Sequence, residues 1–260
     1  MNFDFKKSFG QNFLQDENII DKIVKSSNID KNTLLIEIGP GAGALSKKTI
    51  PLSGYAILYE IDTRLKEILN DVLNKYSNYE IIFNDVLKQD IKSDISRFDY
   101  EKIYVVANLP YYITTPIITK LIDEIHPDKI VIMIQDEVAD RLSANVGSRE
   151  YGMITVLLDA KYNIKKLFKV SRNCFKPVPN VDSAVISLEK HDKYLINNED
   201  KFNKLIKDAF KYKRKNLRNN LMGYDLIKIE KILKDNGYSL SDRAEVIPVS
   251  LFVDIANLLD

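Results

Sequence analysis

The sequence predicts an α/β protein with a mostly parallel, doubly wound sheet over residues 1–190 and a small all-helical C-terminal domain over residues 191–260. Three observations lead to this fold class. Short runs rich in Ile and Val alternate with amphipathic stretches through the first two thirds of the chain. These runs lack the strict alternation of a half-exposed sheet, as expected for parallel strands covered on both faces. Beyond Phe202 the pattern of apolar residues is helical throughout.

Five of the apolar runs are expected to form the parallel strands, and amphipathic stretches connect them. The expected strands are Thr33–Ile38, Tyr55–Ile61, Glu80–Phe83, Lys102–Asn108 and Lys129–Gln135. The expected helices between them include Thr63–Tyr76 and Thr115–Glu124. Two later runs, Ile164–Val170 and Ser183–Glu189, have no segment of helical length between them. They could therefore close the sheet as an antiparallel hairpin.

A polar stretch after Lys190 separates the sheet from the helical segment. Beyond it, apolar residues recur at helical spacing, for example at Leu226, Ile229 and Leu233, and Gly237 follows as a helix stop. A helical domain of this size is too small to be very stable unless it packs on the first domain.

Composition excludes several classes of protein. No apolar run approaches the ~20 residues of a membrane span, and the N-terminus lacks the apolar core of a signal peptide. The single cysteine, Cys174, allows no intramolecular disulfide. The sequence argues against a zinc site and against a Ser-His-Asp triad, because it has only two histidines, His126 and His191, besides this cysteine. We expect a cytoplasmic protein that binds no metal and no membrane, and we see no oligomerisation seam, so we expect a monomer.

A glycine-rich loop follows the first expected strand, in Gly39-Pro40-Gly41-Ala42-Gly43. Such a loop lets the backbone approach a ligand, and Gly39, Gly41 and Ala44 also match the G-x-G-x-x-A version of the dinucleotide fingerprint. Glu60 at the end of the second strand could accept both ribose hydroxyls of a nucleoside. Asp85, at the end of the third strand, could accept a hydrogen bond from an adenine amine. Ligands bind at these strand ends, so the three features predict a site for an adenosine-containing cofactor, either a dinucleotide or S-adenosylmethionine.

The fourth expected strand ends in Asn108-Leu109-Pro110-Tyr111, the most specific feature of the sequence. The N6 amine of adenine is a poor nucleophile because its lone pair is delocalised into the ring. The Asn108 side-chain oxygen and the carbonyl of Leu109 or Pro110 could each accept one N6–H. This would localise the lone pair and orient it toward a methyl donor. Tyr111 offers a face on which the adenine can stack.

The motifs FGQNFL, IEIGPGAGAL and NLPYYITTP resemble those of the KsgA family of small-subunit rRNA adenine N6,N6-dimethyltransferases. The resemblance covers Ser8 to about Glu189 and extends into FKYKRKNLRNNL. It implies a Rossmann-like methyltransferase domain with a mostly parallel seven-stranded sheet, and S-adenosylmethionine as the cofactor. It also implies two methyl transfers to each of two adjacent adenosines, in the hairpin near the 3′ end of small-subunit (16S) rRNA. The substrate it implies is a pre-ribosomal 30S particle.

The same resemblance assigns site residues. It places the cofactor contacts at Asn12, Leu14, Gly39, Glu60, Asp85 and Asn108, with Gln11 and Gly41 beside them. It implies that Leu109, Pro110 and Tyr111 hold the target base, and that Phe175 closes over the other face of the adenine.

A basic segment is the expected contact with RNA phosphates. Residues Lys201 to Asn220 contain eight Lys or Arg and one acid, Asp208, although the net charge of the chain is only +1. Such a run is also common on a solvated helix face. We expect RNA phosphates to be bound by Lys211, Lys213, Arg214, Lys215 and Arg218, with Lys6 and Lys7, and secondarily by Arg141 and Arg149.

Three alternatives stay open on the sequence alone. A related class methylates an adenine in large-subunit (23S) rRNA and confers macrolide resistance, but Leu109 and Thr114-Thr115-Pro116 favour the small-subunit class. A nucleic-acid-binding factor on the same fold would not need the intact motif from Asn108 to Tyr111. A nicotinamide dehydrogenase would leave that motif unexplained.

Overall fold

The computed structural model describes residues 12–259, which form two compact units. The first unit contains residues 12–139 and 165–190, and the second contains residues 140–164 and 191–259. The predicted boundary at residue 190 thus differs from the observed division, because residues 140–164 belong to the helical unit. The reason is apolar packing, since Val156 and Ala160 are buried in one core cluster with Phe202 and Phe252.

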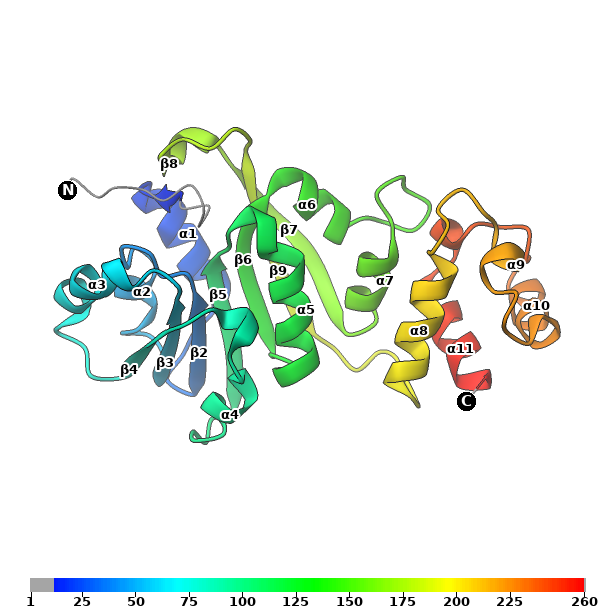
Figure 1. Cartoon of the computed structure of the whole chain (residues 1–260), viewed down its shortest axis with the longest axis horizontal. Helices are drawn as coiled ribbons and strands as arrows, with labels where there is room; N and C mark the ends of the chain where they lie inside the picture. The colour runs from blue at the N-terminus through cyan, green and yellow to red at the C-terminus, as the bar shows by residue number, and fades with distance from the viewer. Residues whose placement is uncertain (1–11, 260) are drawn as a thin grey trace. The chain divides into compact units, whose positions relative to one another are not determined.

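The first unit is built on a seven-stranded sheet of order β4-β3-β2-β5-β6-β9-β7, and Figure 1 shows the strands side by side in this order. Strands β4, β3, β2, β5 and β6 are parallel, and β9 runs antiparallel to β6. The strands are β1 (Phe13–Leu14), β2 (Thr33–Ile38), β3 (Tyr55–Glu60), β4 (Tyr79–Phe83), β5 (Lys102–Asn108), β6 (Lys129–Gln135), β7 (Tyr162–Val170), β8 (Phe175–Lys176) and β9 (Ser183–Lys190).

The predicted strands β2, β5 and β6 are confirmed residue for residue, and β3, β4, β7 and β9 are confirmed with end shifts of one or two residues. Strands β2 and β6 are buried almost throughout, so they carry apolar residues on both faces. The short antiparallel pair of β1 and β8 was not predicted, because two-residue strands leave no periodic signal in a sequence.

Helices cover both faces of the sheet. The helices of this unit are α1 (Glu17–Ser27), α2 (Ser46–Thr49), α3 (Lys66–Leu73), α4 (Ile91–Ile95) and α5 (Thr114–Ile125), and α6 (Asp136–Leu142) begins in it and ends in the second unit. Helices α1, α2 and α3 pack with one set of strand side chains, including Leu35, Leu58 and Val106. Tyr59 alternates with Leu58 along β3, and its hydroxyl donates to Asp94 of α4 at 3.0 Å. Helix α4 therefore covers the opposite face of the sheet.

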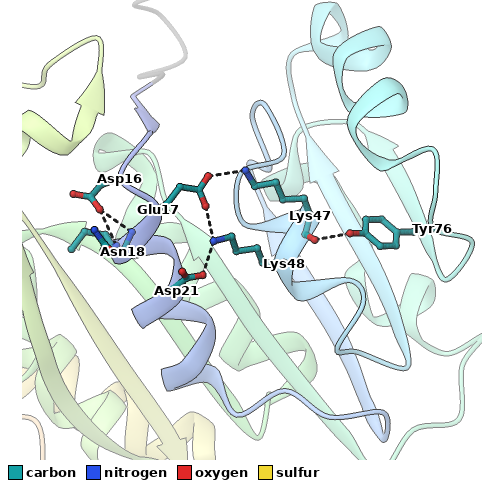
Figure 2. A network of polar contacts seen from close by, with 8 residues as sticks. Asp16, Glu17, Asn18, Asp21, Lys47, Lys48 and Tyr76 are labelled. Carbon is teal, nitrogen blue, oxygen red and sulfur yellow. Dashed lines mark hydrogen bonds and ion pairs between the residues drawn. The ribbon is translucent and has the colours of Figure 1, made fainter.

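Ion pairs on the surface connect α1 to α2 (Figure 2). The Glu17 carboxylate contacts Lys47 Nζ at 2.8 Å and Lys48 Nζ at 2.5 Å, and Lys48 also contacts Asp21 at 2.6 Å. Hydrogen bonds from Lys47 and Lys48 lower the pKa of Glu17 to about 2. Residues 12–14 precede α1, and the glycine loop precedes α2. The ion pairs therefore connect the two helices that follow these two segments of the site.

The second unit is helical and has its own apolar core. Its helices are α7 (Met153–Asp159), α8 (Glu199–Ala209), α9 (Leu217–Asn220), α10 (Leu226–Asp235) and α11 (Val249–Leu258). The predicted helix stop is confirmed, because α10 ends at Asp235 and Gly237 has φ +80°. No helix among residues 12–259 is long and apolar enough to span a membrane.

Candidate active site

A cavity lies at the carboxyl ends of the parallel strands of the first unit. Its empty space is about 770 Å³, including the part that opens to solvent. Ends of β2, β3, β4 and β5 contribute to it, which is where ligands bind in open α/β sheets. The lining residues are Asn12, Phe13, Ile38, Gly39, Gly41, Tyr59, Glu60, Ile61, Asn84, Asp85, Val86, Asn108, Leu109, Pro110, Tyr111, Tyr112 and Ile113.

The glycine loop forms one wall of the cavity, and Gly41 is the position where only glycine fits. Its φ is +59°, in the left-handed region that side chains disfavour. A Cβ atom on Gly41 would lie 2.9 Å from the Phe13 ring. The N-terminal segment therefore packs directly against this loop.

Glu60 at the end of β3 is buried, and both carboxylate oxygens are held by backbone donors. Its Oε2 accepts from Gly41 N at 3.1 Å, and its Oε1 accepts from Asp62 N at 2.9 Å. Burial raises the pKa of the Glu60 carboxyl, whereas these hydrogen bonds oppose that shift. Each oxygen keeps a second lone pair, so the fixed carboxylate can still accept a pair of hydroxyl donors.

Asp85 lies at the next strand end along the same side of the cavity. Its Oδ1 accepts from Leu87 N at 3.0 Å and caps a short 3₁₀ turn. Ile61 and Val86 follow the two acids and line the cavity with apolar side chains. Two acids beside two apolar residues form a suitable environment for a ribose and a flat purine.

Asn108 at the end of β5 has its amide orientation set by one contact. The side-chain Nδ2 donates to the Asn12 carbonyl oxygen at 3.0 Å. A carbonyl can only accept, so the amide nitrogen must face Asn12, and Oδ1 lies on the other side of the amide. Asn108 lines the cavity, and its amide oxygen is an acceptor with a fixed direction.

The turn after Asn108 is rigid. The Pro110 carbonyl accepts from Ile113 N at 3.3 Å and from Thr114 Oγ1 at 3.1 Å. The Tyr111 hydroxyl and Ser183 Oγ lie 2.6 Å apart. Ser183 is fully buried at the start of β9, so a residue from a distant part of the sequence fixes the Tyr111 ring.

Of the residues that the sequence assigned to the site, Gln11 lies outside the described residues, and Leu14 and Phe175 do not line the cavity. Leu14 is buried in the core, so only its backbone could contact a cofactor. Phe175 is 3% exposed and packs in the same core cluster. Its strand, β8, pairs with β1 through Leu14 and thereby supports the segment that contains Asn12. A base could reach Phe175 only if β8 moved away from the core.

Sequence reasoning missed four residues that shape the site, namely Phe13, Ile61, Tyr112 and Ser183. Ile61 is 43% exposed and directly follows Glu60, the acid at the end of β3. An apolar residue at such a position is a signal by which the sequence could have assigned it to the site. Tyr112 directly follows Tyr111 and lines the same cavity, although the sequence assigned only Tyr111 to the site. Phe13 and Ser183 act through distant packing, which no local pattern indicates.

The predicted RNA-contacting residues lie in the helical unit, except Lys6 and Lys7, which lie outside the described residues. Lys211, Lys213, Arg214, Lys215 and Arg218 are all exposed, and all but Arg218 lie in the loop between α8 and α9. Arg218 is 3.7 Å from Glu230, whereas Arg214 and Lys215 form no ion pair with any described residue. Arg141 and Arg149 are also exposed in this unit. No cluster of three or more His, Cys, Asp or Glu suited to a metal occurs among residues 12–259.

Comparison with known proteins identifies the family. The model of the family described as ribosomal RNA adenine dimethylase matches residues 2–260. The chain belongs to the ribosomal RNA adenine dimethylase family. It is similar to ribosomal RNA small subunit methyltransferase A of Staphylococcus carnosus, with 40% identity over 99% of this chain and 90% of the relative. The corresponding protein of Staphylococcus aureus (strain JH9) is 45% identical over 85% of this chain and 76% of the relative.

Solved structures agree with this assignment. A dimethyladenosine transferase from Plasmodium falciparum superposes with a TM-score of 0.77 at 26% identity, covering 94% of this chain and 95% of that one. The 23S rRNA methyltransferase ErmE has the same TM-score at 23% identity, covering 96% and 100%, and shows the shared fold. The predicted Rossmann-like methyltransferase fold is therefore confirmed. The protein is an S-adenosylmethionine-dependent enzyme that dimethylates adenine in ribosomal RNA.

The cavity fits an adenosine-containing methyl donor. Glu60 presents a buried carboxylate that two backbone N–H groups hold in place, as a pair of ribose hydroxyls requires. Gly39 and Gly41 bring bare backbone to the cavity wall, both at positive φ. The Asp85 carboxylate, just after β4, is an acceptor of the kind that an exocyclic amine needs, and Asn108 lines the same cavity from the end of β5.

Glu37 on β2 gives a prediction about stability. It is fully buried, and its Oε2 has no hydrogen-bond partner within residues 12–259. Burial raises the pKa of Glu37 to about 8. Between pH 4.5 and about 8, Glu37 therefore keeps its proton in the native protein, whereas in the unfolded chain it loses that proton. The free energy of unfolding should fall as pH rises between these two pKa values, by at most about 1.4 kcal/mol per pH unit from this group.

Chemical denaturation from pH 5 to 9 measures this effect. Glu37→Gln keeps the shape of the protonated carboxyl but cannot titrate. The free energy of unfolding of this variant should therefore not show the decrease with rising pH that Glu37 causes. The exposed Glu67→Gln should follow the wild type. Equal pH slopes for the wild type and Glu37→Gln would show that Glu37 is already ionised in the native protein.

Proposed function

We propose that this protein dimethylates two adjacent adenosines in the hairpin near the 3′ end of small-subunit rRNA. It would act as a monomer without a metal, on an assembling 30S particle. Cofactor contacts are assigned to Asn12, Gly39, Glu60, Asp85 and Asn108, with the backbone of Leu14 beside them. The observation that carries the proposal is the contact between Asn108 Nδ2 and the Asn12 carbonyl, since it fixes the acceptor that the reaction needs.

The geometry favours Leu109 over Pro110 as the second acceptor. The Pro110 carbonyl already accepts two hydrogen bonds, from Ile113 N and Thr114 Oγ1. A carbonyl oxygen has two lone pairs, so its capacity is used. We therefore assign the Asn108 Oδ1 and the Leu109 carbonyl as the pair that accepts the two N6–H groups. Pro110 holds the turn that presents them.

S-adenosylmethionine, when bound, supplies a methyl group on a positively charged sulfur. The chain's own residues make the adenine amine able to attack it. Asn108 and Leu109 draw the two N6–H bonds toward acceptors that do not move, which favours a pyramidal nitrogen with a localised lone pair. The cofactor would supply the methyl group to this nitrogen, and the surplus N6 proton would pass to solvent.

Tyr111 would hold the target base in place. Its ring lines the cavity, and its hydroxyl is fixed by Ser183. A fixed aromatic ring can stack on an adenine that has left its helix, which lowers the cost of flipping. After the first transfer only one N6–H remains. Rotation about the C6–N6 bond would then leave either Asn108 or Leu109 as its acceptor.

The basic loop would supply affinity for the RNA backbone. Arg214 and Lys215 are exposed and form no ion pair with described residues, so they can contact phosphates at little cost. Replacing both with alanine should raise the KM for small subunits about tenfold and leave kcat unchanged. It should also lower the slope of log affinity against log salt by about 1.5. A double replacement of Lys231 and Lys234 on α10 removes the same charge and serves as the control. Equal effects of the two double variants would contradict a specific role for the loop.

Methylation of purified ribosomal subunits tests the proposed function. Unmethylated small subunits and large subunits are incubated separately with the protein and labelled S-adenosylmethionine, and the rRNA is digested to nucleosides. We expect N6,N6-dimethyladenosine from the small subunits alone. Label confined to the large subunits would overturn the small-subunit assignment.

A further inference from the structure

Two consecutive tyrosines line the cavity, yet their environments differ. Tyr111 is half-buried, and its hydroxyl is 2.6 Å from Ser183 Oγ. Tyr112 is 60% exposed and makes no side-chain hydrogen bond or ring contact with any residue of the described chain. Both belong to one 3₁₀ turn, Tyr111–Ile113. One ring is thus fixed by the protein, and the other stands open at the rim of the same cavity.

The backbone under Tyr112 is held firmly. Ile113 N and Thr114 Oγ1 both donate to the Pro110 carbonyl, and α5 begins directly at Thr114. An exposed aromatic residue alone means little, since single surface tyrosines are common. A tyrosine on a fixed turn at the mouth of a functional cavity is different, because a ligand can use its face without ordering the chain.

The occupant follows from the chemistry of the cavity. If the target adenine enters beside Tyr111, the sugar-phosphate chain places the adjacent nucleotide at the rim. That nucleotide has lost its stacking neighbour, so its base exposes an apolar face. Every base can stack on an aromatic ring, and such stacking changes affinity several-fold to about a hundredfold.

We propose that Tyr112 forms a second base-binding position, on which the nucleobase adjacent to the target adenine stacks. The inference rests on the proposed function, in which the two methylated adenosines are neighbours. It gives the two tyrosines different tasks. Tyr111 holds the base under reaction, and Tyr112 holds the base that precedes or follows it.

Steady-state methylation of unmethylated small subunits tests this position. Tyr112→Ala should lower kcat/KM for the subunits about tenfold. Its Kd for S-adenosylmethionine, measured by calorimetry, should match that of the wild type. Tyr112→Phe and Tyr112→Trp retain an aromatic face and should retain the rate. Leu52→Ala is the matched control, because Leu52 is 42% exposed in the same unit and does not line the cavity.

A change in the RNA completes the test. Uridine stacks more weakly than adenosine. When uridine replaces the adenosine next to the target, the difference in kcat/KM between the wild type and Tyr112→Ala should therefore become smaller. An unchanged difference would overturn the proposal, as would a Tyr112→Ala enzyme with wild-type kcat/KM. A raised Kd for S-adenosylmethionine in Tyr112→Ala would also overturn it, since the ring would then contact the cofactor. An inactive wild type would overturn the proposed function and this inference together, whereas an active wild type equalled by Tyr112→Ala overturns the inference alone.

Discussion

Asn108→Ala is expected to lower kcat for methyl transfer by about two to three orders of magnitude. Removing one fixed group that stabilises charge in a transition state costs this much in other enzymes. The alanine variant loses the acceptor for one N6–H and also the contact that ties β5 to Asn12. The first loss lowers kcat, and the second weakens cofactor binding. Single-turnover measurements at saturating S-adenosylmethionine isolate the first effect.

Two further variants make this result interpretable. Asn108→Asp has the same shape, but its carboxylate cannot donate to the Asn12 carbonyl, so the side chain loses its fixed direction. We expect it to be impaired almost as severely as the alanine variant. Asn32→Ala removes an exposed asparagine that bonds Glu101 and lines no part of the cavity, and it should retain the wild-type rate. A fully active Asn108→Asp would contradict the assigned orientation of the amide.

Glu60→Ala is expected to weaken S-adenosylmethionine binding about a hundredfold. The buried carboxylate is the only group that we assign to the ribose, and hydrogen bonds to a charged group are the stronger kind. Glu60→Gln should weaken binding about tenfold, because its amide nitrogen would face either Gly41 N or Asp62 N, both of which are donors. Calorimetric titration measures both effects, and the exposed Glu67→Gln is the control.

The pH dependence of cofactor binding provides a separate test of Glu60. Burial raises the pKa of its carboxyl, so it gains a proton at a higher pH than an ordinary glutamate does. Protonation removes an acceptor, and the affinity for S-adenosylmethionine should therefore fall as pH is lowered toward that pKa. Glu60→Gln cannot titrate and should lack this acid limb. The same limb in both proteins would assign the titration to another group.

The strand ends of the site were predictable because they combine two local signals. Glu60, Asp85 and Asn108 each follow a run of apolar residues, and the end of a parallel strand is where such side chains meet. The three lie around one cavity, as expected. The fold was predictable from apolar runs as well, since β2 and β6 are buried almost throughout and β5 is buried over Val105, Val106 and Ala107.

Contacts between distant segments were not predictable from local patterns. The family resemblance assigned Phe175 to the face of the adenine, yet the pairing of β8 with β1 buries its ring in the core. Ser183 fixes Tyr111 across 72 positions of sequence, and Asn12 orients Asn108 across 96. The division of the chain into two units could not be predicted for the same reason, because α7 precedes β9 in sequence but packs with the helical unit.

Mass spectrometry of rRNA from cells lacking this protein tests the central claim most directly. We predict that small-subunit rRNA from these cells lacks N6,N6-dimethyladenosine. The wild-type protein should restore the modified nucleoside, and an equally abundant Asn108→Ala variant should not. Persistence of dimethyladenosine in the deleted strain, or its full recovery with Asn108→Ala, would contradict the account.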